Sequence, residues 1–434
     1  MKKCILTSVL FFFFILPNFG QNNFLTVVTS DIDNFWDAYD KIITTKDTLK
    51  QYDYLNKYYI DKGSNGLKEI MQLRNYSPKN YIDAINKYPL FWMSIRPNTY
   101  KSKQLSPDLE VGILQLKKMY PPLKPSTLYF TIGSFRTNGT ISNNTILIGS
   151  EMALANKNTV TTELPDYLQY YYSTLHPMDN IVLLTVHECV HNQQKPMVHN
   201  LLSYCLYEGV AEFVSTKATR KPSFLPAIEF GKANEAKVKA KFESDLFKMN
   251  ISNDWLWSTK VNEFKMRDIG YYVGYAICEN YYNKASDKEK AIKDMIELDY
   301  ENTEQFEQFV DQSGYLSVSL KKLYDVYDKS RPYIVSISQF ENNSKNVNPK
   351  LTTITLNFSI PMDKETRGFD YGPLGEDNVL RVSKVIGFSE DGRSFTYEVE
   401  LQPNHHYQSL ITNRFSSVDG IALKPFLIDI TTSK

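Results

Sequence analysis

Cysteine is scarce in this chain, which argues against a fold held together by disulfide bonds. Only 4 of the 434 residues are cysteines, and the first of them, Cys4, lies in the N-terminal segment. The other three, Cys189, Cys205 and Cys278, are an odd number, so they cannot all pair within one molecule. Because their neighbours are apolar or aromatic, we expect them to pack as small hydrophobic residues in a core. A disulfide between Cys189 and Cys205 is the alternative.

The chain also lacks an excess of either charge and a long apolar run. It has 49 basic and 49 acidic residues, and loss of Lys2 and Lys3 with an N-terminal signal leaves 47 against 49, a net charge of −2. This balance indicates neither nucleic acid nor an anionic membrane as a partner. The apolar run from Val9 to Leu16 is shorter than the about 20 residues that a membrane helix needs. No later segment offers them, so we expect no transmembrane helix.

The N-terminus is typical of an export signal. Lys2 and Lys3 precede the apolar run, and we expect residues 1–20 to be removed near Gly20. Since Cys4 precedes the apolar run, we expect no lipid anchor on it. The mature protein would then be periplasmic, cell-surface or secreted.

The remaining composition is typical of packed globular domains. Hydrophobic residues make up 42%, aromatic residues 14% and charged residues 23% of the chain. Apolar residues three and four apart predict a helical N-terminal region over residues 21–125. Alternating patterns predict strands over residues 126–151, with Asn138-Gly139 as a β-hairpin turn, and again over residues 331–434. Helices lie between these strand regions, so the predicted fold class is α+β.

The segment from His187 to His191 reads His-Glu-Cys-Val-His within the apolar run IVLLTVHECVH, which predicts a helix. Residues four apart share a helix face, so His187 and His191 can bind one metal ion. Glu188 lies about 100° further round the helix and stays free beside a metal-bound water. Two histidines with a glutamate between them suit zinc.

A third metal ligand is expected downstream, because a catalytic zinc ion takes three protein ligands and a water molecule. The segment from Glu208 to Glu212, Glu-Gly-Val-Ala-Glu, offers two carboxylates on the next predicted helix. Glu208, which follows His191 by 17 positions, is the preferred ligand of one Zn²⁺ ion. Glu212 would then bind the free N–H of a ligating histidine. The opposite assignment of the two glutamates stays open.

These two motifs resemble the gluzincin-type zinc metallopeptidases, and the layout over residues 30–330 resembles predicted zinc-dependent proteases of Bacteroidetes. The resemblance implies a mainly helical, thermolysin- or aminopeptidase-like catalytic domain over residues 126–330, with an edge strand beside the metal helix. Residues 331–434 resemble bacterial Ig-like domains, which implies a C-terminal β-sandwich. Such a domain would space or attach the protein at the cell surface.

Two further matches follow from this resemblance. Tyr271-Tyr272-Val273-Gly274 looks like the segment whose tyrosine stabilises an oxyanion, which implies a catalytic role for Tyr271. Gly139, Thr140, Ile141 and Ser142 occupy the place of the substrate strand. Ser142 replaces the glutamate that binds a free amino terminus, so aminopeptidase specificity is not implied.

The resemblance therefore predicts a secreted zinc-dependent peptidase, a hydrolase in which Glu188 is the general base for a metal-activated water. Its partner would be a peptide or protein substrate. The alternatives are a surface adhesin or binding protein with a degenerate peptidase scaffold, and a metal-dependent amidase.

Overall fold

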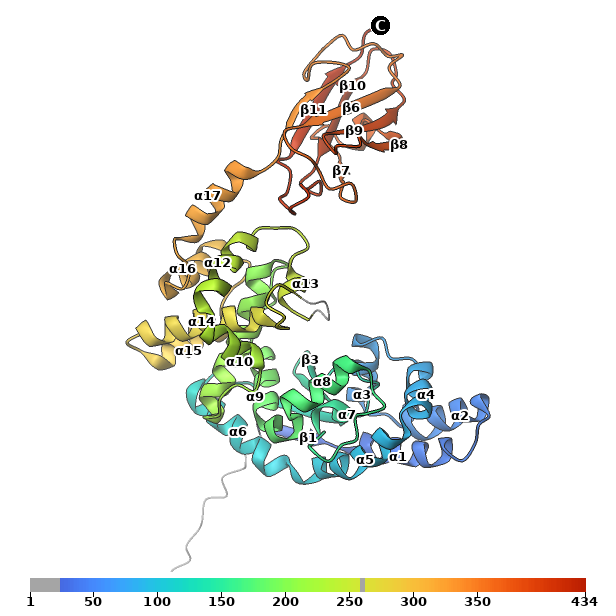
Figure 1. Ribbon diagram of the computed structural model, residues 1–434, viewed down its shortest axis with the longest axis vertical. Coiled ribbons are helices and arrows are strands. Elements are labelled where there is room, and N and C mark those ends of the chain that lie inside the picture. The colour runs from blue at the N-terminus through green and yellow to red at the C-terminus, as the bar shows by residue number, and fades with distance from the viewer. Residues whose placement is uncertain (1–23, 258–261) are drawn as a thin grey trace, which may run out of the picture.

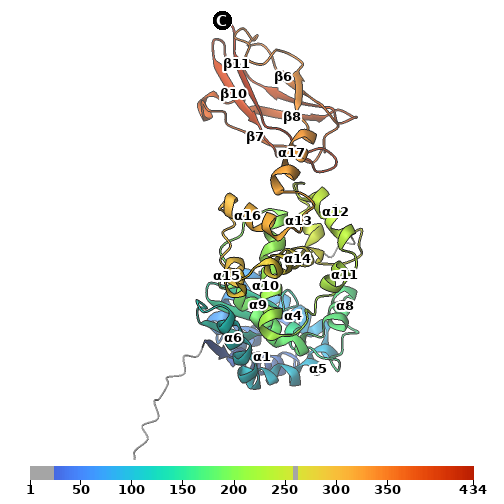
Figure 2. The same ribbon diagram turned by 90° about the vertical axis from the view of Figure 1, so that its left-hand side faces the viewer.

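The computed structural model describes residues 24–257 and 262–434. A helical body and a β domain are joined through helix α17 (Leu320–Ser330), with the β domain uppermost in Figure 1. The view turned by 90° shows the same separation (Figure 2). The predicted export signal, residues 1–20, lies outside the described residues.

A four-stranded sheet organises the helical body. Its strand order is β1-β2-β4-β3, with β1 (Leu25–Val28), β2 (Ser126–Thr131), β3 (Gly139–Ser142) and β4 (Thr145–Gly149). β1, β2 and β4 are parallel neighbours, and β3 runs antiparallel to β4 at the edge. β1 precedes the N-terminal helices and β2 follows them. Because these two strands pair, the two ends of the N-terminal helical region belong to one sheet.

The predicted hairpin turn at Asn138-Gly139 is wrong. The tight turn is Asn143-Asn144, which joins β3 to β4, whereas residues 132–138 form a loop between β2 and β3. Asn143 has a left-handed φ of 51°, a conformation that asparagine adopts more readily than most residues. β2 pairs with β4 and not with β3, so the strand that follows the loop becomes the edge.

A buried carboxylate holds the loop before β3. Glu151 has no exposed surface, and its two oxygens accept hydrogen bonds from the backbone N–H groups of Gly133 (2.8 Å) and Phe135 (3.1 Å). Phe135 is held at a φ of 64°, which is uncommon for a bulky residue. Burial raises the pKa of Glu151 to about 7, although the two backbone bonds act in the other direction.

Helices make up most of the body around this sheet. They precede the metal motif as α1 (Ser30–Ile42), α2 (Thr48–Leu55), α3 (Asn65–Leu73), α4 (Pro78–Lys87), α5 (Pro89–Tyr100), α6 (Ser106–Met119), α7 (Ser150–Ala153) and α8 (Asp166–Leu175). Those that follow it are α11 (Pro226–Ala233), α12 (Glu235–Asp245), α13 (Ser252–Trp255), α15 (Lys288–Ile296) and α16 (Thr303–Ser313). One hydrophobic core runs from Leu25 to Leu320 and includes residues on both sides of position 125. The division of the chain into domains at that position stays a prediction.

Three central helices bring the predicted site residues together: α9 (Ile181–His191), α10 (Leu201–Thr219) and α14 (Ile269–Lys284). Every residue of α9 from Leu183 onward is buried, including the polar residues Thr185, His187, Glu188 and His191. α10 and α14 approach closely at two glycines, Gly209 and Gly274. A Cβ atom at either position would collide with the backbone of the other helix.

The β domain has its own hydrophobic core. One sheet has the order β5-β6-β9-β8 and the other β11-β10-β7. The strands are β5 (Ile334–Ile337), β6 (Thr353–Phe358), β7 (Phe369–Asp370), β8 (Val382–Phe388), β9 (Ser394–Val399), β10 (His406–Ile411) and β11 (Phe426–Thr431). The predicted α+β class is confirmed, whereas the peptidase-like and Ig-like assignments stay predictions.

Hydrogen bonds fix the junction between the two bodies. The Arg331 guanidinium donates to the carbonyl oxygens of Ala422 (3.0 Å) and Leu423. The Tyr327 hydroxyl accepts from the backbone N–H of Ala422 (3.1 Å), and Met249 donates its N–H to the Gly420 carbonyl (2.9 Å). The β domain is therefore held at one end by the helical body.

Cys189, Cys205 and Cys278 are free and buried. Their prediction as core residues is confirmed, and the alternative disulfide does not form. Among the described residues, no helix combines the length and apolar character that crossing a membrane requires.

Candidate metal centre

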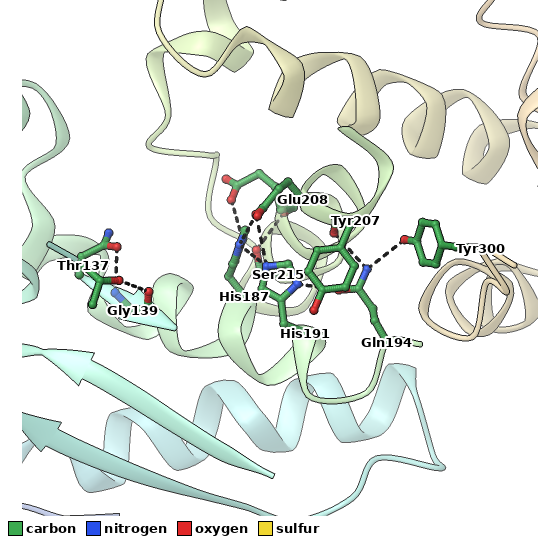
Figure 3. Close-up of polar contacts among 11 residues, drawn as sticks. Thr137, Gly139, His187, His191, Gln194, Tyr207, Glu208, Ser215 and Tyr300 are labelled. Atoms are coloured by element: carbon green, nitrogen blue, oxygen red, sulfur yellow. Dashed lines mark hydrogen bonds and ion pairs between the residues drawn. The ribbon is translucent and has the colours of Figure 1, made fainter. Parts of the chain in front are cut away.

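His187, His191 and Glu208 converge on one point between α9 and α10 (Figure 3). The two histidine Nε2 atoms are 3.0 Å apart. The Glu208 Oε2 atom is 3.4 Å from Nε2 of His187 and 3.3 Å from Nε2 of His191. A tetrahedral zinc ion with bonds of about 2.0–2.1 Å holds its ligand atoms about 3.3 Å from one another. The spacing of the three atoms therefore fits a zinc ion.

Each histidine is oriented by a hydrogen bond on its outer nitrogen. Nδ1 of His187 lies 3.0 Å from Oε2 of Glu212, as predicted for the carboxylate that supports a ligating histidine. Nδ1 of His191 lies 2.6 Å from Oε1 of Gln194. Because Nδ1 faces these partners in both rings, Nε2 is turned toward Glu208.

Gln194 and Tyr207 are parts of this centre that sequence reasoning missed. The Gln194 amide donates from Nε2 to the Tyr207 carbonyl (3.0 Å), which fixes the side chain that contacts His191. The Tyr207 ring stacks on the His191 ring, with centroids 4.4 Å apart. Gln194 follows His191 by three positions, a spacing at which side chains meet in a helical turn. The spacing of His191 and Gln194 could therefore have indicated this contact from the sequence.

The site is buried and rich in carboxylates. His187, Glu188, His191 and Glu208 are each less than 10% exposed. Burial lowers the pKa of His187, but the carboxylates of Glu208 and Glu212 outweigh it and raise the pKa to about 10. Burial also raises the pKa of Glu188. The pKa of Glu208 falls below its usual range because the two histidines outweigh its burial. Buried carboxylates in such a place favour a bound cation.

Glu188 lies between the metal centre and the edge strand. A Cβ atom at position 139 would be 2.6 Å from Oε1 of Glu188, so a larger residue there would have to displace that carboxylate. Thr140, Ile141 and Ser142 continue β3 beyond this contact and pair with β4. The strand predicted beside the metal helix is therefore present at that place.

Tyr271, the third residue of α14, lies in its first turn and faces His187. The two rings are stacked with centroids 6.3 Å apart and an interplanar angle of 24°. Burial and the Glu208 carboxylate raise the pKa of the Tyr271 phenol well above its usual value, so it stays protonated. The structure thus brings every predicted ligand and neighbour to one place, while their metal-binding roles remain predictions.

Fold and site together define an α+β protein with a buried centre of two histidines and a carboxylate, beside the edge strand β3. A family model described as "Gliding motility protein GldB" matches residues 22–266, which is more than half of the chain. The chain therefore belongs to the GldB family.

This assignment corrects the interpretation drawn from the two motifs. The matching family describes a gliding motility protein, so the identification as a gluzincin-type zinc metallopeptidase is wrong, and with it the predicted peptidase function, the enzyme class and the hydrolase description. The roles inferred for Glu188 as general base and Tyr271 as oxyanion donor lose their basis. The alternative of a binding protein agrees better with the family.

The family is one of lipoproteins, which is consistent with an exported or cell-surface protein. It weighs against the expectation that the chain carries no lipid anchor. Cys4 lies outside the described residues.

Comparison with solved structures adds no argument about fold or function. The S-layer protein rSbsC(31-844) is 14% identical, with a TM-score of 0.18, over 65% of this chain and 44% of that one. The N-terminal part of the S-layer protein SbsC is 15% identical, with a TM-score of 0.19, over 65% and 76%. The chain thus spans less than half of the first structure's length. No protein with a curated description matches it in sequence.

Proposed function

We propose that this protein is an exported component of the gliding machinery that binds an extended segment of a protein partner along β3. The observation that carries the proposal is the position of β3, which is the edge strand of its sheet and contacts the metal centre through Glu188. An edge strand presents unpaired backbone groups to a partner strand.

The backbone groups that β3 offers can be named from its register. Ser142 is opposite Thr145 across a two-residue turn, and in such a hairpin this closing pair is hydrogen-bonded. Since bonded and non-bonded pairs alternate, Thr140 is turned toward β4, whereas Gly139 and Ile141 are turned away. The Gly139 N–H already donates to Oδ1 of Asn138 (2.8 Å), and its carbonyl accepts from the Thr137 hydroxyl. The backbone groups of β3 that remain for a partner are therefore those of Ile141.

A divalent metal ion, best zinc, is part of this proposal. His187, His191 and Glu208 would hold it, with Glu212 and Gln194 fixing the two imidazole rings. When bound, the ion supplies a Lewis-acidic position for a donor atom beside β3. It also ties α9 to α10, so the surface next to β3 keeps its shape.

Export places this surface outside the cytoplasm. The β domain then serves as a spacer held by Arg331 at its inner end, and its finer assignment as an Ig-like module belongs to this proposal. Attachment at the cell surface through the β domain, or through a lipid, would bring the metal centre near other motility proteins.

Genetic complementation tests the proposal in the strain that encodes this chain. Its gene is deleted, and the speed of single cells on glass is measured after return of wild type or variants. Ile141→Pro removes the outward N–H of β3 but keeps the pairing with β4, because proline is tolerated at an edge with that orientation. We expect wild type to restore movement, and Ile141→Pro to stay at the speed of the deletion strain.

Two matched controls accompany this variant. Ile141→Val keeps the N–H, and Ile386→Pro places proline in β8, an edge strand of the β domain. Both should restore movement at equal protein levels in immunoblots. Normal gliding by the deletion strain would refute a role in motility, whereas full rescue by Ile141→Pro would refute binding along β3.

A further inference from the structure

A polar hollow of about 590 Å³ lies in the segment between β5 and β6. Ile334, at the start of β5, pairs with Phe358 at the end of β6, next to the junction with α17. The connecting segment therefore lies at the opposite, outer end. Val347 in this segment donates its N–H to the carbonyl of Thr431 (3.0 Å), close to the C-terminus, which marks the outer tip in Figure 1.

Side-chain amides dominate the lining of this hollow. They belong to Gln339, Asn342, Asn343, Asn346 and Asn348. Each amide can donate and accept hydrogen bonds in a fixed plane, which suits a ligand whose hydroxyl groups do both. The lining includes one acidic residue, Glu341, and no lysine or arginine. Phosphate-bearing and other anionic ligands therefore find no counter-charge there.

The Asn342 side chain fixes the backbone that forms the hollow to β11. Asn342 donates from Nδ2 to the Leu427 carbonyl (2.9 Å) and accepts at Oδ1 from the Asp429 N–H (2.9 Å). The next residue, Asn343, donates its backbone N–H to the Asp429 carbonyl (2.8 Å) and has a left-handed φ of 67°. These contacts with β11 fix the backbone, so little ordering is needed when a ligand binds.

Other amides of the hollow are free to bind a ligand. The side chains of Asn343 and Asn346 are exposed and have no hydrogen-bond partner among the described residues. Phe340, which is partly buried, adds an aromatic surface to the lining. Such a ring can pack against the apolar face of a sugar.

A peptide strand is a poorer fit than a sugar. The segment that forms the hollow already occupies the edge of β11, through bonds from Thr431 N–H to the Ser344 carbonyl (2.8 Å) and from Val347 N–H to the Thr431 carbonyl. No backbone edge of β11 is left there for β-sheet pairing. The volume is within the about 300–1,000 Å³ range of small-ligand sites. We propose that this hollow binds a neutral carbohydrate, such as a segment of a cell-surface or substratum polysaccharide.

Isothermal titration calorimetry on the mature chain tests this binding site. The probes are neutral oligosaccharides built from glucose, mannose or N-acetylglucosamine, and an oligogalacturonate as an acidic counterpart. The test variant is Asn343→Gly combined with Asn346→Ala, because glycine keeps the left-handed backbone while both free amides are removed. Asn413→Ala removes an exposed asparagine from the inner end of the same domain and is the matched control.

We expect at least one neutral oligosaccharide to bind wild type and Asn413→Ala equally, and the double variant at least about tenfold more weakly. Thermal unfolding should show all three proteins equally folded. The proposal is overturned if no neutral probe binds wild type, if the double variant binds as tightly as wild type, or if oligogalacturonate is preferred. None of these results depends on the partner proposed for β3.

Discussion

The helical body and the β domain place their polar side chains in opposite settings. In the helical body His187, Glu188 and Glu208 are less than 10% exposed, and their polar groups face one another in the interior. In the β domain the free amides of Asn343 and Asn346 are neutral and exposed. Buried charges are costly unless they are paired or bind a metal, whereas exposed amides are stable without a ligand. The two regions should therefore respond differently to metal, pH and packing changes.

Metal removal should have the largest effect and should separate the two regions. At a free zinc concentration of about a thousand times the dissociation constant, a bound ion adds about 4 kcal/mol to the free energy of unfolding. We expect dialysis against a chelator to lower the melting temperature of the helical body and to leave the β domain unchanged. Differential scanning calorimetry with and without added zinc measures both transitions.

His187→Ala with His191→Ala is the control for this experiment, because it should make the helical transition insensitive to the chelator. An equal chelator effect on wild type and on this variant would show that the ion binds elsewhere.

The pH dependence of stability should have opposite signs in the two regions. Burial raises the folded pKa of Glu151 from 4.5 to about 7. Between these values the unfolded chain loses a proton that the folded chain keeps, so stability falls as pH rises, by about 3 kcal/mol in total. In the β domain, hydrogen bonds from Gln408 and His406 lower the pKa of Asp429 to about 2. The stabilisation that Asp429 gives to the folded β domain is present above pH 3.8 and is lost as the pH falls through about 2.

The melting temperatures of the helical body and of the β domain, measured between pH 2 and pH 8, test both predicted changes of stability with pH. In Glu151→Gln the melting temperature of the helical body should change less between pH 4.5 and 7 than in wild type. The difference between the two proteins is the contribution of Glu151, apart from that of the histidines in the metal centre. A slope that is unchanged in Glu151→Gln would contradict the assignment.

A smaller effect is expected from packing at glycines. In Gly274→Ala the new methyl group meets the Cys205 carbonyl and Gly209, so α10 and α14 must separate, at a cost of about 2 kcal/mol. Gly387→Ala in β8 meets no atom and only strains a φ of 120°, at about 1 kcal/mol. Urea unfolding measures both. If Gly274→Ala were more stable than wild type, helix propensity would outweigh the close approach of the helices.

Local patterns predicted the helical half of the site. The spacing of His187 and His191 places both on one face of α9, and the segment around Glu208 lies on α10, as the helix predicted after His191 requires. The burial of the three cysteines followed from their apolar neighbours. These predictions succeeded because each depends on residues within one or two helical turns.

Contacts between distant segments were not predictable in this way. The pairing of β1 with β2 joins residues about a hundred positions apart, and no local pattern indicates it. Asn138-Gly139 has the composition of a hairpin turn, yet the backbone turns at Asn143-Asn144 because β2 pairs with β4. The role of Glu151 depends on a loop that forms only once the sheet is assembled. Nor does a ligand set determine function, because the same chemistry serves unrelated proteins.

The metal centre is tested most directly by the metal content of the mature protein, purified without chelators and measured by inductively coupled plasma mass spectrometry. The account predicts one zinc ion per wild-type chain and its loss from His187→Ala with His191→Ala, while Asn413→Ala keeps it. Wild-type protein that is folded but takes up no zinc, even when zinc is added, would contradict the account.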